Sequence, residues 1–179
     1  EKQGPLAGIR VFDLSRILAG PSATQILGDL GAEIIKVERP ETGDDTRKWG
    51  PPFLEKDDRT PSSESSYYLS ANRNKKSITI DFCSDDGQKL IRDLLAKSDI
   101  LVENYKTGGL QKYGLDYQSL KQDFPHLIYA SLTGFGHTGP LADQAGYDFL
   151  IQAMGGIMSL TGDIDGMPMK TGVAISDLM

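Results

Sequence analysis

The sequence predicts an α/β fold in which helices cover both faces of a doubly wound, parallel sheet. Two observations lead to this prediction. Short apolar runs that suit buried strands alternate along the chain with segments in which apolar residues recur at the spacing of a helix. The repeated strand–helix–strand units are also long enough for parallel strands, because each crossover needs room for a helix. In such a sheet, ligands bind beyond the carboxyl ends of the strands.

The first part of the chain is expected to form three strands, at residues 9–13, 33–37 and 77–82. A helix is expected at 21–30, where Pro21 suits the first turn and Gly31 suits the exit. One face of this helix carries Ala23, Ile26, Leu27 and Leu30. The polar segment 40–66 contains four prolines and is predicted to be a long surface loop.

The second part continues the alternation. A helix is expected at 86–97, with its inward face formed by Leu90, Ile91, Leu94 and Leu95. Further strands are predicted at 99–103 and 127–133, and Asp116 is expected to cap a short helix that runs to about Phe124. The segment 147–158 is apolar on most sides, which predicts a buried helix.

The loops that follow the expected strands have compositions that suit an anionic ligand. The stretch SRILAGP leads into a helix N-terminus, whose free N–H groups favour anions. Arg39 directly follows the second strand, where its planar fork can pair with a phosphate. The alternative is a solvated arginine paired with Glu38 or Asp44. The stretches NRNKKS and ENYKTGGLQKYG suit ligand loops in the same way, with solvated turns as the alternative.

Composition excludes several classes of protein. The 179 residues suffice for one domain with a core, and a net charge of −6 argues against a nucleic-acid binder. The one cysteine, Cys83, cannot form an internal disulfide, and no apolar run is long enough to span a membrane. His126 and His137 have no Cys or His partner at ligand spacing, so no metal site is expected.

The stretch GFGHTG, residues 134–139, has the G-x-G-x-x-G pattern of a dinucleotide loop. It arrives late in the chain, Pro140 follows it, and the next expected helix starts several residues later. The acidic residues about 20 positions further on, Asp163 and Asp165, lie in a turn-like segment. We therefore interpret the stretch as a glycine-rich surface turn.

Seven segments, taken together, resemble family III CoA-transferases, the CaiB/BaiF or formyl-CoA transferase type. In the order of that family they are PLAGIRVFDLSRILAGP, LGDLGAEIIKVERPETGDDTR, NRNKKSITIDF, VENYKTGGLQKYGLDY, YASLTGFGHTGP, AGYDFLIQAMGGIMSLTG and GVAISDL. The resemblance covers almost the whole chain except the stretch around 51–66. The segments around Arg39 and Asn72 look most similar to the succinate–hydroxymethylglutarate CoA-transferase branch.

The resemblance implies a fold and a mechanism. The fold is the Rossmann-like CoA-binding domain of a CoA-transferase, of which residues 1–179 would be the N-terminal part. The catalytic residue would be Asp177, whose carboxylate attacks an acyl-CoA thioester and forms a covalent intermediate. CoA would then pass to a carboxylic acid, with succinyl-CoA as the candidate donor and a dicarboxylic acid as the candidate acceptor. The CoA thioester is a substrate, and no tightly bound cofactor is implied.

The resemblance also implies which residues contact CoA. They lie in the strand-end loops and near Asp177: Leu18, Ala19, Arg39, Ile80, Cys83, Asn104, Tyr105, Lys106, Lys112, Ala145, Gly146, Tyr147 and Asp148. Lys112 stands where many members have arginine, so the positive charge is kept but the paired N–H donors of a guanidinium group are lost. Leu18 replaces a polar residue of formyl-CoA transferases, which argues against formyl or oxalyl specificity.

Two alternatives accompany the transferase hypothesis. One is an α-methylacyl-CoA racemase-like enzyme, although racemases of this family have histidine where this chain has Tyr147. The other is a truncated CoA-binding module without turnover, since family members run roughly twice this length. The resemblance further implies an interlocked homodimer for the full-length form and a cytoplasmic or mitochondrial matrix location, with no nucleic-acid or membrane partner.

Overall fold

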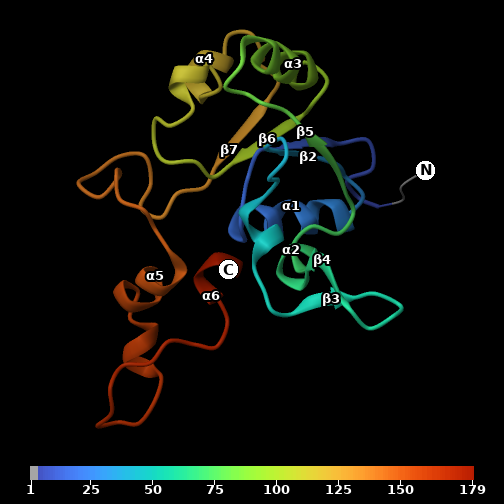
Figure 1. Ribbon diagram of the computed structural model, residues 1–179. Helices are drawn as coiled ribbons and strands as arrows, with labels where there is room; N and C mark the ends of the chain where they lie inside the picture. Colours follow the sequence, from blue (N-terminus) through green and yellow to red (C-terminus); the bar gives the residue numbers. More distant parts are fainter. Residues whose placement is uncertain (1–3) are drawn as a thin grey trace. The chain divides into compact units, whose positions relative to one another are not determined.

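A computed structural model describes residues 4–179, and it confirms the α/β fold with a parallel central sheet (Figure 1). The chain forms two compact units, divided between Leu132 and Thr133, and each is described by itself. The N-terminal unit holds the five-stranded sheet, with strands in the order β5-β2-β1-β6-β7. Their bounds are β1 Arg10–Asp13, β2 Glu33–Glu38, β5 Lys75–Thr79, β6 Ile100–Glu103 and β7 Ile128–Ser131.

All four strand pairings in this sheet are parallel. The central strand β1 pairs with β2 on one side and β6 on the other, so Val11 faces both Ile34 and Ile100. The chain builds outward to β5, returns to the centre and then builds to β7. The order therefore reverses between β1 and β6, which is the point where doubly wound sheets bind ligands.

Alternation along the strands produces two cores, one on each face of the sheet. Phe12 and Leu101 pack with the fully buried Ile91 and Leu95 of helix α3 (Asp85–Leu95). On the other face, Val11 joins a second cluster with the side chains of Ala32, Ile34, Val102 and Leu27. Leu27 belongs to helix α1 (Ala19–Asp29), and Figure 1 shows α1 and α3 on opposite faces of the sheet.

Helix α1 buries a different face from the apolar one that the sequence suggests. Its buried residues are Gly20, Pro21, Thr24, Gln25 and Gly28. Ile26 is 56% exposed and Leu30 is 42% exposed. The reason is close packing, because a Cβ on Gly28 would lie 3.1 Å from Cγ1 of Ile34. Small residues therefore face the sheet. Of the predicted apolar stripe, Ala23, Ile26 and Leu30 are exposed, and only Leu27 packs against the core.

Helix α3 forms where it is predicted, with one error in its inward face. Ser84 caps it by accepting a hydrogen bond from the Gly87 N–H at 3.1 Å. Ile91 and Leu95 are fully buried and Leu94 is half-buried, but Leu90 is 47% exposed. The prediction that Leu90 points inward is wrong, since the buried stripe is narrower than the run of leucines.

Strand β5 begins at Lys75, two residues before the predicted start, and ends at Thr79 rather than Phe82. The sequence pattern places the strand at the apolar alternation of SITIDF. In the structure, Lys75 pairs with Ile34 of β2 because its ammonium group is neutralised inside the protein. Lys75 thus belongs to the strand, with its charge in a buried ion pair with Asp13.

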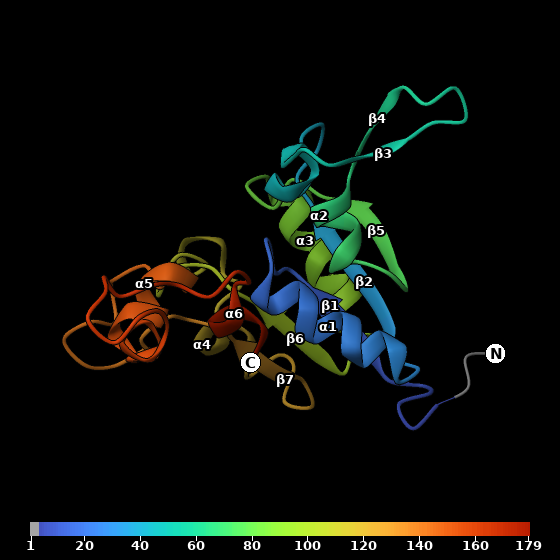
Figure 2. The ribbon, with the colours of Figure 1, turned by 90° about the horizontal axis from the view of Figure 1, so that it is seen from below.

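The segment 40–66 is not a loop without regular structure, so that prediction is wrong. It holds a 3-10 helix, η1 (Asp45–Lys48), and an antiparallel hairpin of β3 (Phe53–Glu55) and β4 (Pro61–Ser65). Helix α2 (Ser66–Ser70) follows directly, capped by Ser65. Figure 2 shows the hairpin projecting away from the main sheet. Such a two-stranded element has too few apolar residues for a sequence pattern to reveal it.

The remaining elements of this unit lie between β6 and β7. They are the 3-10 helix η2 (Gln111–Tyr113) and the short helix α4 (Tyr117–Leu120). Asp116 caps α4 as predicted, accepting from the Gln118 N–H at 3.2 Å. The helix ends at Leu120, however, and does not reach Phe124.

The C-terminal unit, residues 133–179, contains α5 (Asp148–Met154), the 3-10 helix η3 (Ile157–Leu160) and α6 (Ile175–Leu178). The single buried helix expected at 147–158 is wrong on two counts. It breaks at Gly156, which adopts a left-handed φ of +86°, and Phe149 is 61% exposed. Across residues 4–179, none of the helices has the length and apolar character needed to cross a membrane.

Candidate functional site

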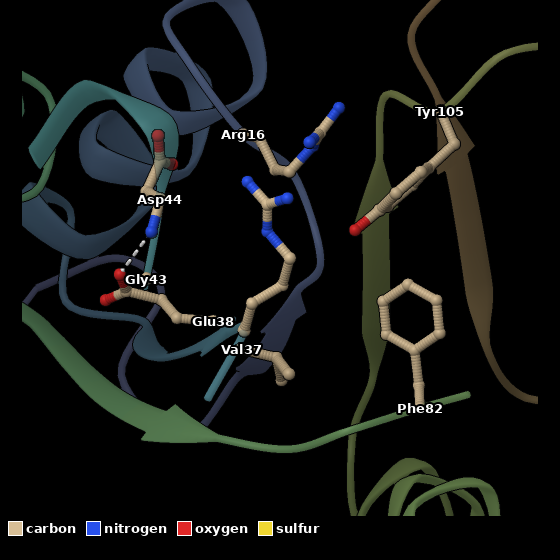
Figure 3. Close-up of a pocket in the computed structure, with 8 residues that line it drawn as sticks. Arg16, Val37, Glu38, Gly43, Asp44, Phe82 and Tyr105 are labelled. Carbon is tan, nitrogen blue, oxygen red and sulfur yellow. Dashed lines mark hydrogen bonds between the residues drawn. The ribbon is translucent and has the colours of Figure 1, made fainter. Parts of the chain in front are cut away.

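A small pocket lies at the carboxyl edge of the parallel sheet in the N-terminal unit (Figure 3). It is lined by residues that follow or end four strands, together with the segment after β2: Arg16, Val37, Glu38, Arg39, Gly43, Asp44, Phe82 and Tyr105. This is the edge at which a doubly wound sheet collects its ligand-binding loops. Arg39 and Tyr105, two of the residues predicted from the sequence, line it directly.

The loop between β1 and α1 is held in a strained conformation. Asp13, the buried end of β1, accepts hydrogen bonds from the Ser15 N–H at 2.9 Å and the Thr24 hydroxyl at 2.6 Å. Ile17 adopts a φ of +72°, which is unfavourable for a β-branched residue. Its N–H lies 3.3 Å from a carboxylate oxygen of Asp44. Contacts from outside the loop therefore determine its shape.

Two buried lysines hold this loop in place through hydrogen bonds and ion pairs. The Lys36 ammonium donates to the Ser15 carbonyl at 3.0 Å and to Asp44 at 2.9 Å, and both side chains of that ion pair are 1% exposed. The Lys75 ammonium lies 3.2 Å from Asp13. Burial lowers the pKa of Lys75 to about 8, although the charge of Asp13 opposes the change. Each lysine is therefore matched by one buried carboxylate.

Asp44 connects Lys36 to both the β1–α1 loop and the segment after β2. Besides Lys36, its carboxylate accepts from the Thr46 N–H at 3.0 Å and the Thr46 hydroxyl at 2.8 Å. Burial acts to raise its pKa, but the charge of Lys36 and these hydrogen bonds outweigh burial, so the pKa of Asp44 lies below its ordinary value. Asp44 is thus an anion at neutral pH and unites the β1–α1 and β2–η1 loops.

Glu38, the last residue of β2, anchors the segment that follows it. Arg47 donates to both of its carboxylate oxygens at 2.7 Å. Tyr68, Ser77 and the Asp44 N–H donate to the same carboxylate at 2.9, 2.6 and 2.8 Å. Burial alone would raise the pKa of Glu38, but these donors lower it to about 2. Figure 3 shows the bond from the Asp44 N–H.

Two arginines share one carboxylate at the mouth of the pocket. Arg16 donates to Asp45 at 3.1 Å, and Arg39 forms an ion pair with the same carboxylate. The Arg16 guanidinium also lies 5.1 Å from the centre of the Tyr105 ring. Within the described residues, the buried Nε of Arg16 has no hydrogen-bond partner. Paired guanidinium groups at a strand edge are suited to binding phosphate.

Arg16 was not among the residues predicted from the sequence. The available signal was its place in the strand-end stretch SRILAGP, but a single arginine there has no pattern that separates it from a solvated one. Asn104, which was predicted, explains how Arg16 is placed. The Asn104 side chain accepts from the Arg16 N–H at 2.8 Å and donates to the Arg16 carbonyl at 2.7 Å.

The other predicted residues of the N-terminal unit lie around the same edge. Leu18 occupies the N-cap position of α1 without a side-chain capping bond and is 7% exposed, and the half-buried Ala19 begins the helix. Tyr105 is half-buried with its ring edge-on to Phe82, and Lys106 is exposed.

Ile80 and Cys83 follow β5 and are not part of the strand. Ile80 is 5% exposed and packs into the core on the α3 face of the sheet. Cys83 is exposed, with its sulfur 3.4 Å from the Tyr113 hydroxyl. The Lys112 ammonium lies 4.7 Å from the centre of the Tyr113 ring. The structure thus brings Cys83 and Lys112 to the same tyrosine.

The remaining predicted residues lie in the C-terminal unit. Ala145 and Tyr147 are exposed, Tyr147 by 70%. Gly146 lies against Gly134, because a Cβ on Gly146 would be 2.3 Å from the Gly134 Cα. The GFGHTG stretch is therefore a turn packed on backbone, and the next helix does not begin until Asp148.

Asp148 and Asp177 are brought together within this unit. Asp148 Oδ1 accepts hydrogen bonds from the N–H groups of Ser176 at 2.8 Å and Asp177 at 3.4 Å. Asp177 is half-buried on α6, and burial together with the charge of Asp148 raises its pKa. A more basic carboxylate is a better nucleophile once ionised. In residues 4–179, no group of three or more potential ligand side chains is placed to hold a metal ion.

Comparison with known proteins identifies relatives of this chain. Residues 6–179 match the model of CoA-transferase family III. A protein of Agrobacterium fabrum named succinate–glutarate CoA-transferase is 55% identical over 99% of this chain and 44% of its own length. The human succinyl-CoA:glutarate CoA-transferase is 52% identical over 97% of this chain and 38% of its own length. The chain thus spans less than half the length of these relatives.

A solved structure agrees with the sequence relatives. The crystal structure of a CaiB/BaiF family protein from Brucella suis superposes with a TM-score of 0.92 at 56% identity. The match covers 99% of this chain and 46% of that protein.

Replacing Glu38 with Gln should reduce the dependence of the free energy of unfolding on pH between about pH 2 and 4.5. The pKa of Glu38 is about 2 in the folded protein, and its ordinary value is 4.5. Ionised Glu38 therefore contributes to the free energy of unfolding above pH 4.5, and this contribution is lost as the pH falls toward 2. Glu38→Gln should therefore cost about 3 kcal/mol at pH 7 and almost nothing near pH 2. Urea unfolding between these pH values measures this difference. Glu55→Gln, on the exposed hairpin, is the control, and a pH-independent loss for Glu38→Gln would contradict the assignment.

Replacing Asn104 with Ala should release the loop that carries Arg16. The change removes two hydrogen bonds to the Arg16 backbone, so we expect a loss of about 1–3 kcal/mol in stability. Amide hydrogen exchange at Arg16 should accelerate, while exchange in α3 should change only as far as global stability does. Asn104→Ala with unchanged protection at Arg16 would show that other contacts hold the loop.

Proposed function

Because this chain belongs to CoA-transferase family III, we propose that the protein transfers coenzyme A from an acyl-CoA thioester to a carboxylic acid. The donor we propose is succinyl-CoA, and the acceptor is a dicarboxylic acid such as glutarate. The observation that carries this proposal is the identity of more than half of the aligned residues to relatives named for that exchange. The strand-edge pocket and the half-buried Asp177 supply residues suited to its two tasks, binding CoA and covalent transfer.

The mechanism that we propose uses Asp177 as the nucleophile. A carboxylate oxygen of Asp177 attacks the thioester carbon, the C–S bond breaks and CoA leaves as the thiolate. The thiolate then attacks the Asp177 carbonyl of the resulting mixed anhydride, which releases the donor acid and leaves an aspartyl-CoA thioester. Anhydride and thioester have similar transfer potential, so splitting the exchange in this way avoids a single difficult step.

The second half of the reaction reverses the first with a new acid. The acceptor carboxylate attacks the aspartyl thioester and releases the CoA thiolate. The thiolate attacks the acceptor carbonyl of the new anhydride, which forms the product acyl-CoA and returns Asp177 as a carboxylate. Atoms and charge balance without an oxidant, a metal ion or ATP. The raised pKa of Asp177 supports this role, because it makes the carboxylate more nucleophilic.

We propose that the carboxyl edge of the sheet binds the CoA moiety. Arg16 and Arg39 would contact a phosphate group in place of Asp45, their present partner. The exposed Lys106 and Lys112 add positive charge in the neighbouring loop. Lys112 presents a point charge in place of a fork, so it would bind a phosphate with less geometric selectivity than arginine.

The alternatives find less support. Against a racemase-like reaction, this chain has Tyr147 where the racemases of the family have histidine. The homodimer implied by the family resemblance is also a proposal. It agrees with the exposed apolar side chains of the C-terminal unit, since large apolar patches mark interaction surfaces.

Removing a phosphate-binding charge should weaken CoA binding. We expect Arg16→Ala, Arg39→Ala and Lys112→Ala each to raise the Kd for CoA by about 5- to 150-fold, the equivalent of about 1–3 kcal/mol for a charged hydrogen bond. Isothermal titration calorimetry measures this change in the intact protein. Lys56→Ala removes the same charge from the exposed hairpin and should leave the Kd unchanged. Unaltered affinity in all three variants would remove the assignment of this edge to CoA.

Asp177 should carry the covalent intermediate. After incubation with succinyl-CoA, hydroxylamine should convert Asp177 to a hydroxamate, which mass spectrometry detects on its peptide. Asp177→Asn should reduce transfer to glutarate to background while CoA still binds. Asp177→Glu moves the carboxylate by one methylene, and a misplacement of about 1 Å can cost about 100-fold. Asp163→Asn, in an exposed turn of the same unit, is the control. A label on Asp148, or near-normal transfer by Asp177→Asn, would refute the mechanism.

A further inference from the structure

Gln152 stands out as a buried polar side chain in the C-terminal unit. Residues 133–179 are all described by the structure, and only Gln152 and Met158 among them are buried. Gln152 is 1% exposed, on the inner side of helix α5. A buried amide is costly unless all of its hydrogen-bonding groups find partners. The partners of Gln152 therefore indicate what it does.

All of the hydrogen-bonding capacity of the Gln152 amide is used. Its Nε2 donates to Asp148 Oδ2 at 2.6 Å and to the Val173 carbonyl at 3.2 Å. Its Oε1 accepts from the Thr171 N–H at 2.9 Å and the Thr171 hydroxyl at 3.2 Å. A glutamine offers two donors and two acceptor positions, so none is left over. The amide thus fixes the segment before α6 at two points against α5.

Asp148 extends this connection to α6 itself. While Oδ2 accepts from Gln152, Oδ1 accepts from the N–H groups of Ser176 and Asp177. Helix α6 has four residues, too few to be stable without outside contacts. Asp148 therefore bridges Gln152 of α5 and the first backbone N–H groups of α6 through its two carboxylate oxygens.

We propose that Gln152 is a positioning residue for CoA transfer, which fixes the place of the Asp177 carboxylate through Asp148 and the segment 171–173. The inference rests on the proposed function, in which Asp177 is the nucleophile. Gln152 bonds to Asp148, Thr171 and Val173 and not to the Asp177 carboxylate, and it is not among the residues that line the strand-edge pocket. Its loss should therefore lower the rate of the chemical step and leave CoA affinity unchanged.

Three variants separate this role from a general contribution to folding. Gln152→Met keeps an unbranched side chain of similar length but removes all four hydrogen bonds. Gln152→Glu places an oxygen where Nε2 donated to Asp148 and creates an unpaired acceptor. We expect each to lower kcat about 100-fold with a Kd for CoA within about twofold of wild type, because a shift of about 1 Å suffices for such a loss.

The third variant tests the contact itself. In the double variant Asp148→Asn/Gln152→Glu, an amide donor at 148 faces a carboxylate acceptor at 152, and the hydrogen bond is restored in the opposite direction. We expect its kcat to recover about tenfold over that of Gln152→Glu alone. Absence of any recovery, together with an unchanged kcat in Gln152→Met, would overturn the proposal. If Gln152→Met does not fold, the comparison of Gln152→Glu with the double variant decides.

A readout that needs no turnover distinguishes this proposal from the proposed function. Amide hydrogen exchange at Ser176 and Asp177 should accelerate about tenfold in Gln152→Glu, and the double variant should slow it again. If wild type transferred no CoA but exchange responded in this way, the proposed function would fail while the positioning of Asp177 would stand. If wild type transferred CoA and neither exchange nor kcat responded, the role of Gln152 would be refuted alone.

Discussion

The arrangement of the carboxyl edge of the sheet depends on two buried ion pairs, Asp13 with Lys75 and Asp44 with Lys36. All four side chains are at most 2% exposed. Buried pairs of this kind contribute little net stability compared with apolar residues of the same size, but loss of one partner is costly. Their effect here is on conformation, because they hold the β1–α1 and β2–η1 loops in one arrangement. The left-handed Ile17 persists only because of such contacts.

The same constraint explains the composition of helix α1. A helix that packs over buried charges needs small and polar residues on its inner face, and Thr24 supplies a hydroxyl to Asp13 there. Gly28 lets the helix approach the sheet closely. An apolar inner face would leave Asp13 without one of its donors, and an unsatisfied buried carboxylate is more costly than a smaller apolar core.

Much of the fold could be predicted because periodicity reports burial. The strands β1, β2 and β6 and the helix α3 were found from their apolar pattern, and the rule for parallel sheets placed Arg39, Asn104 and Tyr105 at one edge. The pattern failed where polar residues are buried. Lys75 starts a strand, Thr24 and Gln25 face the core, and Gln152 is the centre of its unit, yet in the sequence each resembles a surface residue. Partners far apart in the chain compensate these groups, and local sequence does not contain them. Arg16 was not predicted for a related reason, because the residues that place it in the pocket, Asp45 and Tyr105, are distant in the sequence.

The contact between Gly134 and Gly146 has a consequence for how this part of the chain can evolve. A Cβ on either glycine would lie 2.3 Å from the Cα of the other, so the two backbones occupy the space that a side chain would need. No change at one position can make room for a substitution at the other, because neither has a side chain to shrink. The two sites therefore cannot drift by compensating exchange, as pairs of core residues do. His137 in the same turn meets no such restriction, because its side chain is exposed.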